Sequence, residues 1–454
     1  MTETQKVAHL LRRFGFGASE QEMEYYGKDG LAGAIEKLLN FEGVEELDID
    51  PTTLDKNGVA NMRHVQTAWF LRMITTRRPL EEKVALFWHH HFATSGQKVT
   101  QAPMMHQQVQ TLRAKGFGRF EHLLLALAQD PAMIFWLDNQ ENLKGKPNEN
   151  FAREVMELFT LGVGHYTEKD VQEAARAFTG WRFRRVKGQR LYEFYLDQRQ
   201  HDNDLKTVLG QTSKLSGDDI CAILASMPQT SRHVARKMWE WFGYDNPDDG
   251  LIDRMAAAYR KGKMETKAIL RAMMEAPEFY SEQSQRGLVK NPVDFVIAPL
   301  RQIGLGEVVR TALADTQDRR IAQLATFARV STKGMGMDLL FPPDVNGWDP
   351  SAAGWISSAT MIERIKFGAN LFLGRNFAGS NPGVLAVGDV TTTKELAKRM
   401  NEILDARIPE VKLINVEKAA DTVLAGKPLN SKTAPPVAAA AARLIFGAPD
   451  YQFN

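Results

Sequence analysis

The chain has 454 residues, of which 44% are hydrophobic and 25% are charged, a composition typical of a globular protein with one large domain or two to three smaller ones. Its 57 Lys and Arg residues against 55 Asp and Glu residues give a net charge of +2, which argues against a dedicated nucleic-acid-binding protein. The one cysteine, Cys221, excludes a disulfide framework and a cysteine-rich zinc module.

Signals for export or membrane insertion are absent from the sequence. No run approaches the ~18 consecutive apolar residues of a spanning helix. The N-terminal stretch MTETQKVAHLLRRFGFG lacks the apolar core and cleavage site of a secretory leader. We therefore expect a cytoplasmic protein, or one whose leader has been removed.

Helix start and stop signals recur along the chain, whereas the alternation typical of strands is scarce. Ser19 and Glu22 have capping-box spacing and predict a helix after the Phe14–Gly17 loop. Pro79 predicts the start of a helix that stops near Gly96. Further helices are predicted from Pro103 to Gly116, over Arg119–Gln129, over Asn148–Leu161 and over Glu168–Gly180, the last capped by Thr167 with Asp170. The predicted fold class is all-α, a multi-helix globular array.

One stretch departs from the helical pattern. Residues 181–196 alternate aromatic or apolar with polar residues on both sides of a turn at Gly188, which predicts a β-hairpin packed against helices. Residues 379–436 are richer in Thr, Pro and Gly, and a helical pattern resumes at 437. We expect a main helical domain over 1–378 and a peripheral helical segment over 379–454 packed on it.

A faint internal repeat links two aromatic-rich helices. LEEKVALFWHHHF (80–92) resembles SRHVARKMWEWF (231–242), and each is followed by a helix that ends before a proline. The alignment places Trp239, Glu240 and Trp241 opposite His89, His90 and His91. The histidines would then be a specialisation of the first copy, although any amphipathic helix stopped by proline gives a similar pattern.

The histidines His89, His90 and His91 are the first candidate site. Successive side chains on a helix turn by about 100°, so His89 and His91 would point apart and could not share a metal. An extended backbone after Trp88 would instead place both rings on one side. The structural alternative is a helix C-terminus, which favours histidine.

A second candidate is the His201-Asp202-Asn203-Asp204 segment. A catalytic metal site needs about three protein ligands and an open position, and His with Asp suits that chemistry. No HExxH signature is present, so the ligands would have to converge from distant segments. The alternative is a polar loop whose Asp202 or Asp204 caps the segment at Lys206.

The third candidate lies on the predicted helix over 148–161. Glu149, Arg153 and Glu157 are four residues apart, a spacing that gives exposed ion pairs of about 0.2–0.5 kcal/mol each. Glu154 lies off that face beside apolar residues and is the candidate buried acid or base. Glu154 and Arg153 are the predicted catalytic residues, with a solvated ion-pair ladder as the alternative.

The fourth candidate is the loop FPPDVNGWDP (341–350). Two adjacent prolines stiffen its start, and Gly347 permits an unusual turn. Such a loop could present Asp344 and Trp348 to a ligand. The alternative is that its tryptophan anchors a long loop to the core.

Several long segments resemble one bacterial family. HLLRRFGFG, FWHHHFATSGQKV, NENFAREVMELFTLGVGHYTEKDVQEAARAFTGW, HDNDLKTVLG, LLFPPDVNGWDPSAAGW and APDYQF occur in this order and resemble the family catalogued as domain of unknown function 1800. The resemblance implies no particular reaction. It implies an alkaline-phosphatase-like partner and a periplasmic or exported location, because many relatives look exported and are encoded beside such proteins. Relatives often have Asn where His90 stands, and many have His in place of Phe159.

Two functional hypotheses follow. In the first, the protein is a metal-dependent, hydrolase-like enzyme acting on a polymer or conjugate. His89, His91, His201 and Asp202 would bind one divalent metal that activates a water, with Glu154 as general acid or base. In the second, it is a non-catalytic helical scaffold that works with the alkaline-phosphatase-like partner in export or surface assembly.

Overall fold

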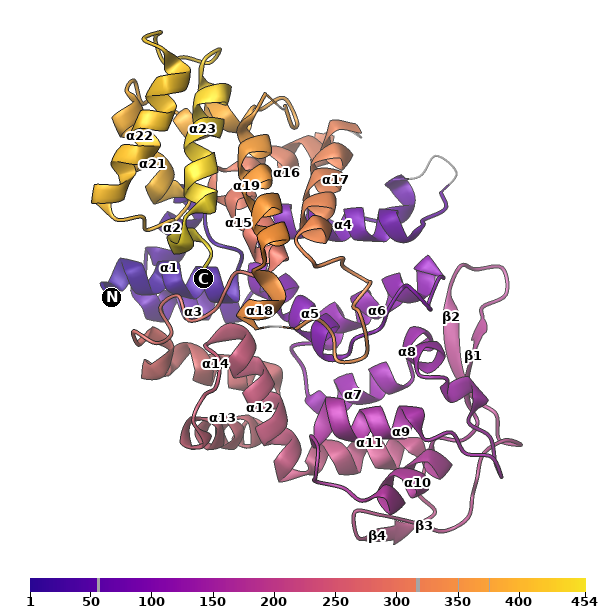
Figure 1. Ribbon diagram of the computed structural model, residues 1–454. Coiled ribbons are helices and arrows are strands. Elements are labelled where there is room, and N and C mark those ends of the chain that lie inside the picture. Colours follow the sequence, from indigo (N-terminus) through magenta and orange to yellow (C-terminus); the bar gives the residue numbers. More distant parts are fainter. Residues whose placement is uncertain (55–57, 316–318, 350, 375) are drawn as a thin grey trace.

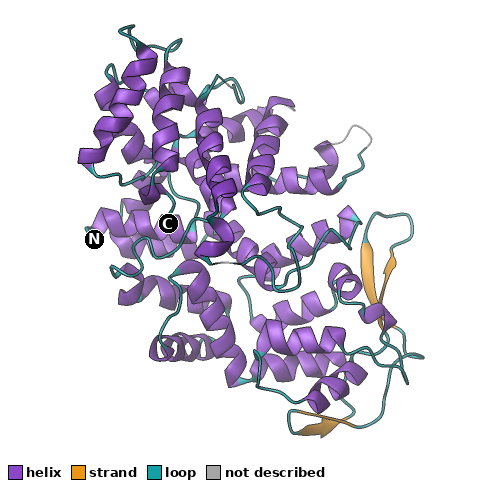
Figure 2. Ribbon diagram, in the orientation of Figure 1, coloured by secondary structure: helices purple, strands orange, loops and turns teal. Residues whose placement is uncertain are grey.

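The structure is a computed structural model that describes residues 1–54, 58–315, 319–349, 351–374 and 376–454. The chain is mainly helical, which confirms the predicted fold class, and it carries two small two-stranded antiparallel sheets at one side of the molecule (Figures 1 and 2). Among the residues described, no helix has the length and apolar character needed to cross a membrane.

The elements of the first part of the chain are α1 (Glu3–Phe14), α2 (Glu20–Gly27), α3 (Gly30–Leu39), the 3-10 turn η1 (Pro51–Leu54), α4 (Met62–Thr75), α5 (Pro79–His91), α6 (Ala102–Lys115), α7 (Phe120–Ala128), α8 (Pro131–Trp136), η2 (Asn139–Glu141), α9 (Asn150–Glu154), the π-helical turn η3 (Val155–Thr160) and α10 (Glu168–Ala177). The strands β1 (Trp181–Arg185), β2 (Tyr192–Leu196), β3 (Lys206–Val208) and β4 (Gln211–Ser213) follow. The remaining elements are α11 (Gly217–Ser226), α12 (Pro228–Phe242), α13 (Asp249–Lys261), α14 (Thr266–Glu275), η4 (Pro277–Tyr280), α15 (Pro292–Gln302), α16 (Leu305–Asp315), α17 (Arg319–Gly334), α18 (Ala352–Trp355), α19 (Ser358–Phe372), α20 (Pro382–Val387), α21 (Thr393–Ile403), α22 (Glu410–Leu424), α23 (Ala434–Gly447) and η5 (Pro449–Tyr451).

The local helix signals are confirmed. Ser19 and Glu22 form the capping box of α2, and Pro79 occupies the first turn of α5. Helix α5 ends at His91 instead of near Gly96, because the chain beyond it pairs with a distant loop: the Gly96 N–H donates to the Leu340 carbonyl at 2.7 Å.

The predicted hairpin is also confirmed. Strands β1 and β2 pair antiparallel with Trp181 opposite Leu196, and Phe183 packs its ring against Phe135 of α8 at 6.1 Å between centroids. The second sheet, β3 with β4, follows the His201–Asp204 segment, and its strands have three residues each. That sheet was not predicted.

Helix α5 lies between two hydrophobic cores, and all of its 13 residues are buried. Val84 and Phe87 belong to the core formed with α1, α7 and α11–α14. Ala85 and Leu86 belong to the core formed with α4, α15, α17, α19 and the C-terminal helices. Helix α23 packs on α19, so the segment 379–454 shares this second core with the rest of the chain; the predicted domain boundary itself stays a prediction.

Charged side chains on α5 are paired inside the protein. Glu82 is fully buried and accepts hydrogen bonds from Trp69 Nε1 at 2.9 Å, from Arg113 Nη2 at 2.9 Å and from Arg72. Lys83 forms a buried ion pair with Asp294 of α15. A buried charge is tolerated only when it is paired and hydrogen-bonded, so these contacts determine how α5 sits against its neighbours.

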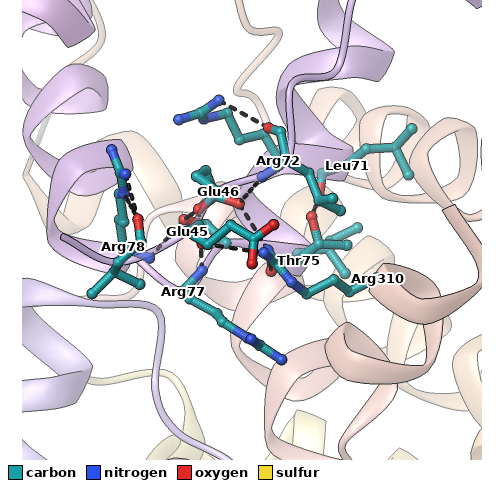
Figure 3. Close-up of polar contacts among 12 residues, drawn as sticks. Glu45, Glu46, Leu71, Arg72, Thr75, Arg77, Arg78 and Arg310 are labelled. Carbon is teal, nitrogen blue, oxygen red and sulfur yellow. Dashed lines mark hydrogen bonds and ion pairs between the residues drawn. The ribbon is translucent and has the colours of Figure 1, made fainter. Parts of the chain in front are cut away.

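Arginines also hold the irregular segment between α3 and η1. Arg310 donates to the Glu45 carbonyl at 3.1 Å and to the Glu46 carboxylate at 2.9 Å (Figure 3). Arg72 donates to the Leu47 carbonyl at 3.2 Å. Backbone carbonyls outside helices and sheets lack a partner within a regular element, and here guanidinium groups supply the hydrogen bonds.

Replacing Glu82 by Gln removes the negative charge shared by two buried guanidinium groups. We expect the free energy of unfolding to fall by about 3–5 kcal/mol, as for other broken buried ion pairs. Urea denaturation measures the change. The matched control is Glu307→Gln, because the Glu307–Arg77 ion pair is half exposed and should contribute at most about 1 kcal/mol. Equal losses in the two variants would contradict this prediction.

Candidate functional site

All three histidines of the first candidate belong to α5, so the helical alternative applies and the extended His89-x-His91 pair is not formed. The His89 ring lies between Trp69 and Trp348, with centroid distances of 5.3 and 5.4 Å. Its Nε2 accepts a hydrogen bond from the Leu340 N–H at 3.1 Å, which places the ring proton on Nδ1. His89 therefore holds the loop that precedes Phe341.

His91 points to a different part of the protein, the π-helical turn η3. Its Nε2 donates to the Phe159 carbonyl at 3.1 Å, and Nε2 of His233 on α12 donates to the Leu158 carbonyl at 3.0 Å. A π-helical turn shifts the backbone hydrogen bonds by one residue, as in the bond from the Leu161 N–H to the Met156 carbonyl at 2.8 Å. Two histidines from two helices thus hydrogen-bond to adjacent carbonyls of this turn.

The second candidate, His201 with Asp202, is tied to the end of α10. His201 Nδ1 donates to the Thr179 carbonyl at 2.9 Å, and the Asp202 N–H donates to the Thr179 hydroxyl at 2.8 Å. The Asp202 carboxylate forms an ion pair with Arg176 at 2.8 Å. These contacts hold the chain that leads from the hairpin into β3.

The predicted metal ligands are not brought together. Within the described ranges, no group of three or more His, Cys, Asp or Glu side chains is placed to bind a metal ion. His91 and His201 donate to carbonyls of separate segments, at Phe159 and Thr179. The predicted divalent metal stays a prediction, and we derive no chemical step through it.

Glu154 and Arg153, the predicted catalytic residues, lie at the end of α9. Arg153 is bound by carboxylates on both sides, Glu168 at 2.7 Å and Glu149 at 3.2 Å. Glu157, the third member of the alternative ion-pair ladder, instead accepts a hydrogen bond from the Tyr166 hydroxyl. Glu154 is half-buried, and burial together with the charge of Glu157 raises its pKa. Their catalytic role stays a prediction.

The fourth candidate loop packs directly on the last turn of α5. The Trp348 N–H donates to Nδ1 of His90 at 3.3 Å, so the proton of the His90 ring lies on Nε2. Gly347 has a φ of 85°, and a Cβ there would lie 2.4 Å from His90 Nδ1. The unusual turn expected at Gly347 is confirmed. Pro350 lies outside the described residues.

A cavity of about 330 Å³ lies between this loop, the end of α5 and helix α12. The predicted ligand-binding residues Asp344 and Trp348 both line it. The cavity is also lined by His90, Lys237, Glu240, Trp241 and Asp349. The His90 ring stacks on Trp241 with 4.8 Å between centroids, and its Nε2 has no hydrogen-bond partner in the described part of the chain.

Two ionisable side chains of α12 face this cavity without a structural partner. Lys237 and Glu240 form neither a side-chain hydrogen bond nor an ion pair with any residue that the structure describes. Burial lowers the pKa of Lys237, which Glu240 partly offsets. Burial raises the pKa of Glu240 against the opposing charges of Arg236 and Lys237. Both shifts favour the neutral form, so the pair can offer an acidic carboxyl and a basic amine.

Sequence reasoning missed Lys237, Glu240 and Trp241 as site residues and gave His90 less weight than its neighbours. The repeat alignment carried a usable signal, because it placed Glu240 opposite His90 on a paired helix. In the structure α5 and α12 are in contact, and these two residues line one cavity. The alignment thus paired two residues, His90 and Glu240, that line this cavity.

The close approach of Gly347 to His90 can be tested by adding one methyl group. Gly347→Ala should lose about 1–2 kcal/mol of stability from its left-handed backbone and about 1 kcal/mol more as the Trp348–His90 hydrogen bond breaks. Gly145→Ala is the control, since Gly145 has a φ of 78° and no atom within 4 Å of its Cβ position. Urea denaturation should show the larger loss for Gly347→Ala, and equal losses would contradict the contact.

The buried histidines predict a loss of stability in mild acid. Burial lowers the pKa of His89 and of His90 to about 3, so both rings take up protons after unfolding. Stability is then complete above the unfolded pKa of about 6.5 and falls as the pH drops toward 3, by about 2 kcal/mol for each ring at pH 5.

Urea denaturation at pH 7 and pH 5 measures this dependence. His90→Gln should remove about 2 kcal/mol of the difference between the two pH values. His165→Gln, which changes an exposed ring, serves as the control. An unchanged pH dependence in His90→Gln would contradict the prediction.

Comparison with known proteins gives one match. Residues 9–453 match the family model described as a protein of unknown function, DUF1800. No curated protein and no solved structure matches the chain. Since the family model covers nearly the whole chain, the protein belongs to the DUF1800 family.

Proposed function

We propose that the cavity between α5, α12 and the Phe341–Asp349 loop is the active centre of a hydrolase-like enzyme. Glu240 acts as the general acid and Lys237 as the general base. One observation carries the proposal: two ionisable groups, both displaced toward their neutral forms, face a cavity without any partner among the described residues. Displaced pKa values in a cleft are typical of catalytic groups.

Other buried charges in this protein support the contrast. Glu82 has two arginine partners, and Lys83 has Asp294. Those charges are paired, and their burial contributes to the packing of helices. Lys237 and Glu240 are partly buried but have no such ion-pair partner among the described residues. This difference favours a chemical role for them over a structural one.

The geometry suggests a division of labour. In its deprotonated form, which burial favours, the Lys237 amine takes a proton from a water molecule in the cavity. In its protonated form, which burial favours, the Glu240 carboxyl gives a proton to the leaving group. His90 Nε2–H is free to donate a hydrogen bond to the oxygen on which charge develops. Asp344 and Trp348 keep their predicted role in binding substrate, and the exposed loop leaves room for one unit of a polymer or conjugate.

A panel of chromogenic substrates tests the proposal. We would assay 4-nitrophenyl acetate, phosphate and glucoside with the intact protein, and then the variants Glu240→Gln and Lys237→Met. We expect kcat/KM for the hydrolysed compound to fall by about 10²–10⁴-fold in each variant, the usual contribution of a general acid or base. Glu282→Gln, at an exposed position, should leave the rate unchanged.

The same panel separates the competing hypotheses. A loss of activity in Glu154→Gln but not in Glu240→Gln would move the site to α9. Absence of turnover for every compound, or equal rates in all variants, would contradict the proposal. That result would favour the non-catalytic scaffold that works with an alkaline-phosphatase-like partner.

A further inference from the structure

Three buried lysines and the half-buried Lys237 differ in what their amines contact. Lys83 is paired with Asp294. The Lys206 Nζ donates to the Asp202 carbonyl at 2.6 Å, and Lys290 Nζ lies 3.6 Å from the centre of the Tyr451 ring. Lys237 has no hydrogen bond, ion pair or ring contact with the residues described, and it faces a cavity. Of these four amines, the Lys237 amine is the one that is partly shielded from solvent and can also be reached by a small molecule in the cavity.

Burial favours an uncharged Lys237 amine. Burial also lowers the pKa of His90, His91 and His233, with the nearby Lys237 as a smaller cause, so the imidazoles beside the amine stay neutral. Glu240 is the acid that acts on it, and burial keeps that carboxyl biased toward its own neutral form. The deprotonated fraction of this amine, which a lowered pKa increases, carries a free lone pair and is a nucleophile.

We propose that Lys237 forms a covalent Schiff base with an aldehyde or ketone that enters the cavity. Nζ attacks the carbonyl carbon, a C–N bond forms, and the carbonyl π electrons move to oxygen. Nζ loses a proton and the oxygen gains one, which gives a carbinolamine. The Glu240 carboxyl then protonates the hydroxyl, which leaves as water while the nitrogen lone pair forms the C=N bond of an iminium. The iminium returns its N–H proton to the Glu240 carboxylate, which restores the carboxyl and leaves the neutral imine. Amine and carbonyl compound thus give imine and water, without oxidant or reductant.

The cavity also indicates which carbonyl compounds fit. Asp344 and Asp349 line it as well, and the negative charge of these two carboxylates disfavours anionic compounds. The rings of Trp241 and Trp348 offer apolar surface to a flat molecule. We therefore expect a neutral aromatic aldehyde to react faster than an anionic aldehyde such as glyoxylate. This inference shares the cavity of the proposed function but does not require hydrolysis.

Reductive trapping tests the inference. The intact protein is incubated at pH 7 with benzaldehyde and sodium cyanoborohydride, which reduces an imine to a stable secondary amine, and labelled lysines are identified by peptide mass spectrometry. We expect Lys237 to be labelled faster than Lys418, which is exposed, since a lowered lysine pKa raises the fraction of neutral amine. Glyoxylate should label Lys237 more slowly than benzaldehyde.

Lys206 is the matched control, because burial lowers its pKa as well but its amine is hydrogen-bonded. Lys237→Met should abolish the fast labelling, and Glu240→Gln should slow it, with unchanged thermal unfolding showing that the variants are folded. Labelling of Lys237 no faster than that of Lys418, or equal labelling of Lys206, would overturn the inference. Fast labelling without turnover of the chromogenic panel would refute the hydrolase and leave this inference standing.

Discussion

Complete burial of α5 is the constraint on which the rest of the structure depends. An unpaired polar group in a protein interior costs about 1–3 kcal/mol, so each polar side chain of this helix needs a partner. Glu82 and Lys83 near its start bind charged groups of neighbouring helices. The three histidines of its last turn bind backbone groups or line a cavity. The position of the Phe341–Asp349 loop follows from these last contacts.

Three adjacent histidines have three different environments because the helix turns each ring toward another segment. His89 and His91 each use Nε2 for a backbone hydrogen bond, to Leu340 and to the π-helical turn, while their buried Nδ1 atoms have no partner among the described residues. His90 uses one nitrogen for Trp348 and keeps the other free at the cavity. The histidine given least weight in the sequence is thus the one with a free ring nitrogen at the cavity. The absence of a side chain at Gly347 lets the loop pack over it.

Local signals could be predicted from the sequence, and long-range ones could not. The capping boxes at Ser19 and Thr167 depend on residues three apart, which the sequence displays directly. The sheet of β3 and β4 has strands too short for a visible alternation. The π-helical turn depends on donors from two other helices. Lys237 and Glu240 resemble the solvated face of an amphipathic helix, because the loop that covers them lies far along the chain.

The shared position of α5 has a consequence for how the molecule loses its structure. Val84 and Phe87 belong to one core, and Ala85 and Leu86 belong to the other. Unfolding of either core would therefore expose one face of α5 to water. Such coupling makes separate folding units unfavourable. We therefore expect the parts of the protein around the two cores to unfold in one cooperative step. A fragment containing only one core would lack packing that α5 provides to both.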